Sequence, residues 1–412
     1  MTAIVACRSG LYLFRAVLSS AQTPTSLRVR LGHFSRANPG HFWRALKLYA
    51  KYGHTTAQEG RALPGNVDLY VAAARAGRLV LDVVVYPEAL LVDPSGGFMN
   101  GPYVGRTYSN GLRIGGVKLT LDASPQGRTA WLSQPYLNAP PGQPADFAGY
   151  PALRDDQVVA AISRAYRNHW QILVHTNGDA AIDQLLRAVE AASTRYPGRD
   201  RRTVMIHGQT LREDQVPKLK ALGIFPALFP MHTFYWGDWY VDTVLGPERA
   251  ANISPTGWMV KNGMIFSSHH DAPVAFPDTM RVLSATVNRT TRSNQVLGPE
   301  HRVEPIVALK ATTLWAAYQH FEERTKGSIE VGKLADFAIL SENPLTIDRQ
   351  KIADIKVLET IKKGKTIYRL DPTRTGENAA PCMESSRCSE RFAVFRANAQ
   401  LTEPFGAPPH LH

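Results

Sequence analysis

The chain is poor in cysteine and has no long apolar run. Its 412 residues contain three cysteines, Cys7, Cys382 and Cys388, too few for a disulfide framework and without the paired spacing of a zinc ribbon. No apolar run reaches the roughly 20 residues that a membrane helix needs. These absences argue against a disulfide-stapled secreted domain and against a membrane partner, and by default we expect a location in the cytoplasm.

Positive charge is in excess but is not concentrated. The formal net charge is +12, with a pI near 9.6, yet the basic residues form only short clusters such as Arg199–Arg202 and Lys362–Lys365. Nucleic-acid binders usually gather such charge on one face or motif. We therefore expect no specific nucleic-acid partner. Binding to an anionic surface stays a third hypothesis, which requires an affinity that falls steeply with salt.

What the chain does contain is an alternation of short apolar runs with helix-period segments. The clearest helical pattern spans Asp179–Tyr196, and Arg154–His169 and Leu211–Leu222 resemble it. Continuous apolar strands separated by amphipathic helices are typical of a parallel sheet that is covered on both faces. The predicted strands are Leu79–Tyr86, Gly115–Leu121, Gln171–His175, Thr203–His207, Ile224–Phe229 and Met264–Ser268.

The residue pattern changes after a helix predicted over Leu314–Phe321. Gly327–Leu340 and Val357–Tyr368 are turn-rich and β-prone, which indicates a small sheet. Residues 371–412 carry Pro, Gly and Ser with little periodicity, and the closing His-Leu-His is more consistent with a loose terminus than with a ligand pair.

Several predicted strands end in residues that bind metals. Lys118, His175, His207 and Asp271 each lie at or near such an end, which is where chemistry gathers in parallel α/β barrels. One histidine on an apolar strand is more often a core residue than a ligand, but a set on consecutive strands favours a metal site. His269 and Asp271 are two residues apart and should point the same way, with His270 pointing away.

Other marked residues have two interpretations each. Trp236 and His232 could line a substrate pocket, although aromatic residues in such a loop are as often packing. Arg128 could hold a substrate carboxylate, but a salt bridge to acidic loop residues is the more ordinary role. Asp179 is expected to be a helix cap.

The motifs, in this order, resemble the amidohydrolase superfamily, in particular its YtcJ-like branch (amidohydrolase family 3). Resemblance covers roughly Asn38 to Tyr368 and implies a distorted (β/α)8 TIM-like barrel followed by a small β-sandwich segment. It divides the chain into an unassigned segment 1–31, a barrel 32–325, a sandwich segment 326–370 and an irregular tail 371–412. The matching text is YGHTTAQEG at Tyr52–Gly60, GGVKLTLDASPQGRTAWLSQPY at Gly115–Tyr136, VHTNGDAAIDQLL at Val174–Leu186, IHGQ at Ile206–Gln209, HHDAPV at His269–Val274 and GSIEVGKLADFAIL at Gly327–Leu340.

The resemblance implies a metal-dependent hydrolase that cleaves a non-peptide, amide-type C–N bond of a small molecule. His175 and His207 match metal ligands on strands five and six, and Lys118 matches a lysine that is carboxylated in some members. Asp271 matches the aspartate that takes a proton from the attacking water, and His269, His232, Trp236 and Arg128 are substrate-contact candidates. We expect one or two divalent ions, with zinc the first choice.

One departure matters most. The superfamily carries a His-x-His pair on its first strand, whereas His33, His41 and His54 stand alone ahead of Lys118. The first match resembles the second strand, so the first strand and half of the sandwich are expected to be missing. An alternative function is therefore a catalytically impaired remnant that binds a ligand without turnover. The sequence leaves a homo-oligomer open.

Overall fold

The computed structural model describes residues 3–7, 39–93, 95–371 and 373. Contacts divide the chain into two units, and the larger one contains Ala3–Cys7 and Pro39–Arg369 of the described residues. In the smaller unit, the Asp371 carboxylate accepts a hydrogen bond from the Thr373 amide at 2.9 Å. Most of the predicted segments 1–31 and 371–412, including the closing His-Leu-His, lies outside the described residues.

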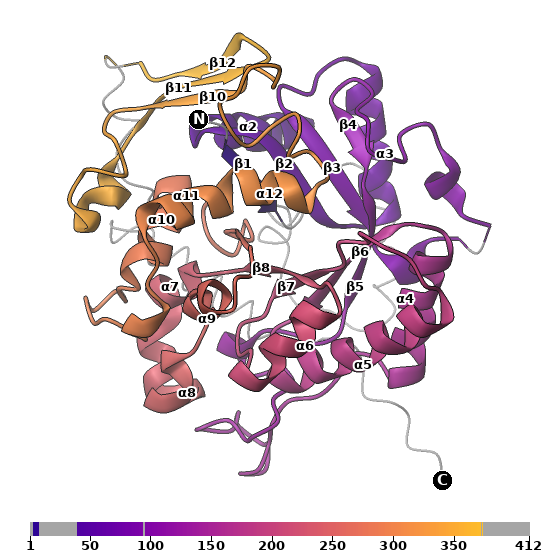
Figure 1. Cartoon of the computed structure of the whole chain (residues 1–412), viewed down its shortest axis with the longest axis vertical. Coiled ribbons are helices and arrows are strands. Elements are labelled where there is room, and N and C mark those ends of the chain that lie inside the picture. Colours follow the sequence, from indigo (N-terminus) through magenta and orange to yellow (C-terminus); the bar gives the residue numbers. More distant parts are fainter. Residues whose placement is uncertain (1–2, 8–38, 94, 372, 374–412) are drawn as a thin grey trace, which may run out of the picture. The chain divides into compact units, whose positions relative to one another are not determined.

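The larger unit contains two parallel sheets, as the apolar runs predict (Figure 1). One sheet has the order β1-β2-β3-β4 and another has the order β5-β6-β7-β8-β9. A parallel bridge between Glu88 and Lys118 links the two sheets. The expected α/β class is confirmed. The strands are β1 (Ala3–Cys7), β2 (His54–Ala62), β3 (Asp82–Pro87), β4 (Leu112–Ile114), β5 (Gly116–Thr120), β6 (Gln171–Thr176), β7 (Val204–His207), β8 (Phe225–Leu228) and β9 (Ser267–Ser268).

Strand β1 corrects the expectation that the first strand is missing. It pairs in parallel with β2, with Val5 opposite Ala57. The run AIVAC is short, apolar and partly β-branched, which suits a strand. Its pairing occupies one edge of β2, where unpaired N–H and C=O groups would otherwise invite association with another chain. The strand position is filled, but AIVAC contains no histidine, so the His-x-His pair is absent from it.

The helices largely follow the predicted periodicity. Helix α5 matches its prediction to within a residue, whereas the pattern over Leu211–Leu222 begins as a 3-10 turn and becomes α-helical at Val216, where Pro217 is tolerated in the first turn. The α-helices are α2 (Pro39–Lys51), α3 (Pro64–Arg75), α4 (Asp155–Arg167), α5 (Asp179–Arg195), α6 (Val216–Ala221), α7 (Met231–Trp239), α8 (Pro247–Ala251), α9 (Thr256–Lys261), α10 (Thr279–Asn288), α11 (Pro305–Thr312) and α12 (Leu314–Gln319). Short 3-10 turns are η3 (Ala89–Leu91), η4 (Gly97–Asn100), η5 (Pro125–Gly127), η6 (Glu213–Gln215), η8 (Pro299–His301) and η9 (Arg349–Asp354), and η7 (Tyr240–Val244) is a π-helix.

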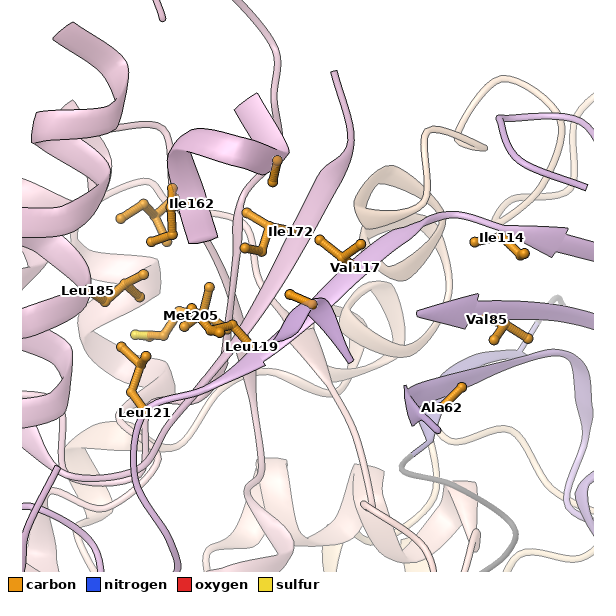
Figure 2. Close-up of a cluster of buried hydrophobic side chains, with 14 of the residues drawn as sticks. Ala62, Val85, Ile114, Val117, Leu119, Leu121, Ile162, Ile172, Leu185 and Met205 are labelled. Atoms are coloured by element: carbon orange, nitrogen blue, oxygen red, sulfur yellow. The ribbon is translucent and has the colours of Figure 1, made fainter. Parts of the chain in front are cut away.

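The two faces of β5 show how the strands are covered on both sides. Leu119 lies in the cluster that also holds Ile162 of α4 and Leu185 of α5 (Figure 2). Lys118, the residue between two such apolar positions, lies beside Leu173 of β6, and Leu173 belongs to a separate apolar cluster. Full burial of each of these apolar side chains contributes about 1.5–3 kcal/mol. Both faces of the sheet are therefore buried, which explains the unbroken apolar runs.

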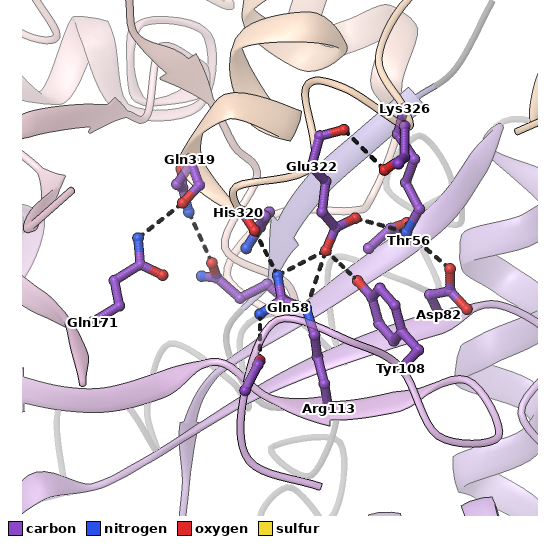
Figure 3. Close-up of polar contacts among 12 residues, drawn as sticks. Thr56, Gln58, Asp82, Tyr108, Arg113, Gln171, Gln319, His320, Glu322 and Lys326 are labelled. Atoms are coloured by element: carbon purple, nitrogen blue, oxygen red, sulfur yellow. Dashed lines mark hydrogen bonds and ion pairs between the residues drawn. The ribbon is translucent and has the colours of Figure 1, made fainter. Parts of the chain in front are cut away.

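Buried charges gather at the amino ends of the strands (Figure 3). Arg113 of β4 lies 2.7 Å from a Glu322 oxygen, and Lys326 lies 2.7 Å from the other Glu322 oxygen. Lys326 also lies 2.8 Å from Asp82, the first residue of β3. Burial alone would raise the pKa of Glu322, but Lys326 and Arg113 outweigh it and lower the pKa to about 2. The network therefore holds its carboxylates ionised inside the protein.

The predicted small sheet is a three-stranded antiparallel one, with β10 (Phe337–Leu340), β11 (Val357–Lys362) and β12 (Lys365–Arg369). It is attached to the parallel strands by Lys362, whose ammonium lies 2.7 Å from the Asp82 carboxylate. Thr360 adds a hydrogen bond of 2.7 Å to the carbonyl of Ala50 at the end of α2. Among the helices in the described ranges, none has the length and apolar character to cross a bilayer.

Candidate active site at the strand ends

The strand register brings the expected ligand positions to one edge of the sheet. Thr120 of β5 lies beside His175 of β6, and Thr176 lies beside His207 of β7. Asp271 follows three residues after the end of β9. Because parallel strands end at a common edge, residues from three separate strands meet there.

His175, His207 and Asp271 converge at this edge. The His175 and His207 rings lie 4.6 Å apart, edge to face, and His207 Nε2 is 3.9 Å from Asp271 Oδ2. All three side chains are buried. His207 and Asp271 also adopt left-handed backbone conformations, with φ of 78° and 50°. Such conformations cost on the order of 1–3 kcal/mol and cluster at functional sites.

Asp122 supports the site and was not singled out from the sequence. Its carboxylate accepts backbone N–H hydrogen bonds from Asn177 at 2.9 Å, Gly178 at 2.7 Å and Trp131 at 3.1 Å. One of its oxygens lies 3.3 Å from His175 Nδ1. This carboxylate fixes the turn after β6 and the loop after β5 together. A carboxylate directly after an apolar strand, in the run LTLDAS, is the signal that could have indicated it.

Asn177 is a second residue that the sequence did not reveal. Its side-chain nitrogen, Nδ2, lies 3.2 Å from His175 Nε2 and 2.8 Å from the carbonyl oxygen of Ala123. Next to it, Gly178 has no room for a side chain, because a Cβ there would lie 1.8 Å from the Trp131 carbonyl oxygen. The loop after β6 is therefore packed tightly around His175.

Lys118 lies deeper than the two histidines. It is level with Leu173, two residues before His175, on the same face of the sheet. Two residues at about 3.3 Å each place the Cα of Lys118 roughly 7 Å below the level of the His175 Cα. The side chain is buried, and the structure places it beneath the edge where the histidines and Asp271 meet.

His269 and His232 continue the ring cluster. His269 lies 4.9 Å from the His207 ring and stacks on Phe229 at 4.9 Å. Phe229 in turn meets His232 edge to face at 4.4 Å, and Trp236 lies 4.8 Å from His232. Burial, with a smaller effect of His269, holds the pKa of His232 well below its usual value.

His270 points to a different place. Its ring lies 5.6 Å from His54 and 5.5 Å from Tyr49, and its Nδ1 accepts a hydrogen bond of 3.0 Å from the Ala272 amide. Its two neighbours in the sequence, His269 and Asp271, contact His207 instead.

Two sequence-based interpretations need correction. The Arg128 guanidinium donates to the carbonyls of Asn138 at 2.9 Å and Ala139 at 3.1 Å, so loop carbonyls take the place of the expected acidic residues. Asp179 does not cap α5, because Gly178 occupies the cap position. Its carboxylate instead accepts from the Ser133 amide and from Arg212, both at 2.9 Å.

The donor types at the edge fit a divalent cation. Two imidazoles and one carboxylate are common ligands of zinc and its neighbours, and three protein ligands leave a position open for substrate or water. Within the described ranges, however, no three His, Cys, Asp or Glu side chains are drawn together around one point. Side-chain rotation at His175, His207 and Asp271 would have to accompany metal binding.

Comparison with known proteins identifies the family. The profile described as "Amidohydrolase family" matches residues 39–368. The chain belongs to the amidohydrolase family. The putative amidohydrolase YtcJ of Bacillus subtilis (strain 168) is 26% identical over 274 residues, which cover 66% of this chain and 48% of that protein. An N-substituted formamide deformylase of Arthrobacter pascens is 26% identical over 213 residues, which cover 52% of this chain and 38% of that protein.

A solved structure supports the same fold. An uncharacterized metal-dependent hydrolase from Pyrococcus furiosus superposes with a TM-score of 0.63 at 26% identity, covering 74% of this chain and 60% of that one. The expected barrel-type fold of the metal-dependent hydrolases in the amidohydrolase family is thereby confirmed. The chain spans about half the length of the curated YtcJ protein that it matches.

Proposed function

We propose that this chain hydrolyses an amide-type C–N bond of a small molecule with the help of a divalent metal ion. The observation that carries the proposal is the meeting of His175, His207 and Asp271 at the carboxyl ends of β6 and β7 and just beyond β9. Membership of the amidohydrolase family supports it. The similarity to an N-substituted formamide deformylase makes substituted formamides the first substrates to try.

In this proposal His175 and His207 hold the ion, with Asp271 as a third ligand and Lys118 as a further candidate from below. Zinc is the first choice, as one ion or two. A bound divalent ion would lower the pKa of water and polarise a carbonyl oxygen. Asp271 would take the proton from the attacking water at its carboxylate and pass it to the departing nitrogen.

Other residues would position the substrate. His269, Phe229, His232 and Trp236 form a run of contacting rings, the aromatic wall, next to His207, which suits an apolar substituent. Asp122 keeps the turn after β6 in place and thereby holds His175 at the edge. Arg128 stays a weaker candidate for substrate contact, because loop carbonyls already engage it.

Metal content is the first test. We expect roughly one divalent ion per chain in the purified protein, and loss of that ion in His175→Ala and Asp271→Ala. His169→Asn is a matched control, because His169 is exposed and its positive φ of 57° suits asparagine. A folded protein that retains no divalent ion in excess zinc or manganese would refute the proposal.

Turnover separates the hydrolase from its alternative, a remnant that binds without catalysis. The absence of the His-x-His pair motivates that alternative. Release of formate from an N-substituted formamide by the metal-loaded protein, abolished in Asp271→Asn, would exclude the remnant. Metal binding with no release of product from formamides or acylated amines would favour it.

A further inference from the structure

Three hydrogen-bonded side chains begin at His232, one ring of the aromatic wall. His232 Nδ1 is 2.6 Å from the Tyr240 hydroxyl, and the same hydroxyl is 3.3 Å from Gln126 Oε1. His232 and Tyr240 are buried. Tyr240 is the first residue of the π-helix η7, and π-helices are rare and occur frequently at functional sites.

The donor and acceptor in each of these two hydrogen bonds follow from the protons that the three side chains carry. Burial raises the pKa of Tyr240 well above its usual value and lowers that of His232, so the phenol keeps its proton and the imidazole is neutral. Gln126 Oε1 can only accept. The Tyr240 hydroxyl donates its one hydrogen to Gln126 Oε1, so its oxygen is left to accept from Nδ1–H of His232. In that arrangement Nε2 of His232 carries no proton.

The neighbours of the ring connect it to the candidate active site. Phe229 contacts the His232 ring at 4.4 Å, the His269 ring at 4.9 Å and the His207 ring at 5.9 Å. Tyr240 engages Nδ1, so a substrate contact to this ring would have to form at Nε2. The backbone carbonyl of Gln126 also accepts from Trp239 Nε1 at 3.1 Å, which fixes η5 against α7 and makes the chain rigid.

We propose that Tyr240 and Gln126 are positioning residues that hold His232 with an unprotonated Nε2, and that this acceptor selects amide-type substrates whose nitrogen carries a hydrogen. The substrate part of the proposal rests on the proposed function, whereas the protonation of the ring does not. A tertiary amide presents a carbon where a secondary amide presents an N–H. It would leave the acceptor unpaired, at a loss of about tenfold in affinity.

The first test is the tautomer of His232, read by nitrogen-15 NMR of histidine-labelled protein. His232→Gln assigns the signal among the thirteen histidines. We expect the Nδ1–H form, and a mixture of tautomers in Tyr240→Phe. Tyr166→Phe is the matched control, since it removes a buried hydroxyl that lies 2.7 Å from the Thr203 hydroxyl, in a different apolar cluster from Tyr240. An Nε2–H form in the unsubstituted protein would overturn the proposal, because Nδ1 would then have to accept a hydrogen bond from the Tyr240 hydroxyl.

The second test is the affinity for N-phenylformamide and for N-methyl-N-phenylformamide, measured by calorimetry with metal-loaded Asp271→Asn protein, in which the proposed function expects no hydrolysis. We expect the first compound to bind about tenfold more tightly. Tyr240→Phe should reduce that ratio, and Tyr166→Phe should leave it unchanged. Equal or unmeasurable affinities would overturn the substrate selection. Neither test uses turnover, so a failure of hydrolysis would count against the proposed function alone.

Discussion

Substitution of Glu322 by glutamine should reveal how much the buried charge network contributes to stability. Arg113 and Lys326 hold the pKa of Glu322 at about 2, against 4.5 for a free glutamate. That difference corresponds to about 3 kcal/mol of folding free energy, in line with the roughly 3–5 kcal/mol lost when one member of a buried ion pair is removed. We therefore expect Glu322→Gln to lower the free energy of unfolding by about 3 kcal/mol at neutral pH.

The difference in unfolding free energy between the two proteins should depend on pH. Because the pKa is depressed in the folded state, the contribution of Glu322 is fully present above the unfolded pKa of 4.5 and is lost as the pH falls towards about 2. Urea unfolding of both proteins should show a constant gap between about pH 7 and pH 5, and a shrinking gap below that. Other carboxylates titrate in both proteins and cancel.

The neighbouring residue supplies the control. Glu323 pairs with Arg202 at 2.9 Å, but its side chain is 28% exposed. Solvent screening limits such a pair to about 1 kcal/mol or less, so Glu323→Gln should have a small effect. Equal losses in the two variants, or a gap that stays constant down to about pH 3, would refute the stability assigned to the network.

Two further substitutions test the loops around His175. Asp122→Asn leaves one acceptor oxygen for the three N–H groups that now donate to the carboxylate. It should lower the free energy of unfolding in urea by about 2–3 kcal/mol, and an unchanged value would contradict this role. Gly178→Ala places a Cβ 1.8 Å from the Trp131 carbonyl oxygen and should abolish soluble expression or lower the melting temperature sharply. Gly65→Ala, in the open first turn of α3, should instead raise stability by up to about 1 kcal/mol, and destabilisation of both variants alike would contradict the steric explanation.

Elements with a strong local pattern could be predicted from the sequence. Helix α5 and strand β6 fall within a residue of their predicted bounds, because apolar spacing alone decides them. Strand β9 is shorter than predicted, with two residues instead of five. Its length depends on the neighbour that it pairs with, which is a property of the assembled sheet and not of the run Met264–Ser268.

The site could be predicted in part, for the same reason. His175, His207 and Asp271 were expected from their positions at strand ends, which is local information. The support from Asp122 was not, since its partner Asn177 lies 55 residues away. The Arg113–Glu322 pair spans 209 residues, and neither residue carries a local signal. Long-range polar contacts of this kind become visible only once the chain is folded.

The carboxylate of Asp82 has a consequence for how the chain is made. The nearest of its ammonium partners, Lys326 and Lys362, lie 244 and 280 residues further along. A growing chain that buried the start of β3 early would enclose a carboxylate without a counter-charge, at a cost of several kcal/mol. We therefore expect the start of β3 to be buried only after Lys326 has been synthesised. A nascent chain that stops short of Lys326 should depend on chaperones to stay soluble.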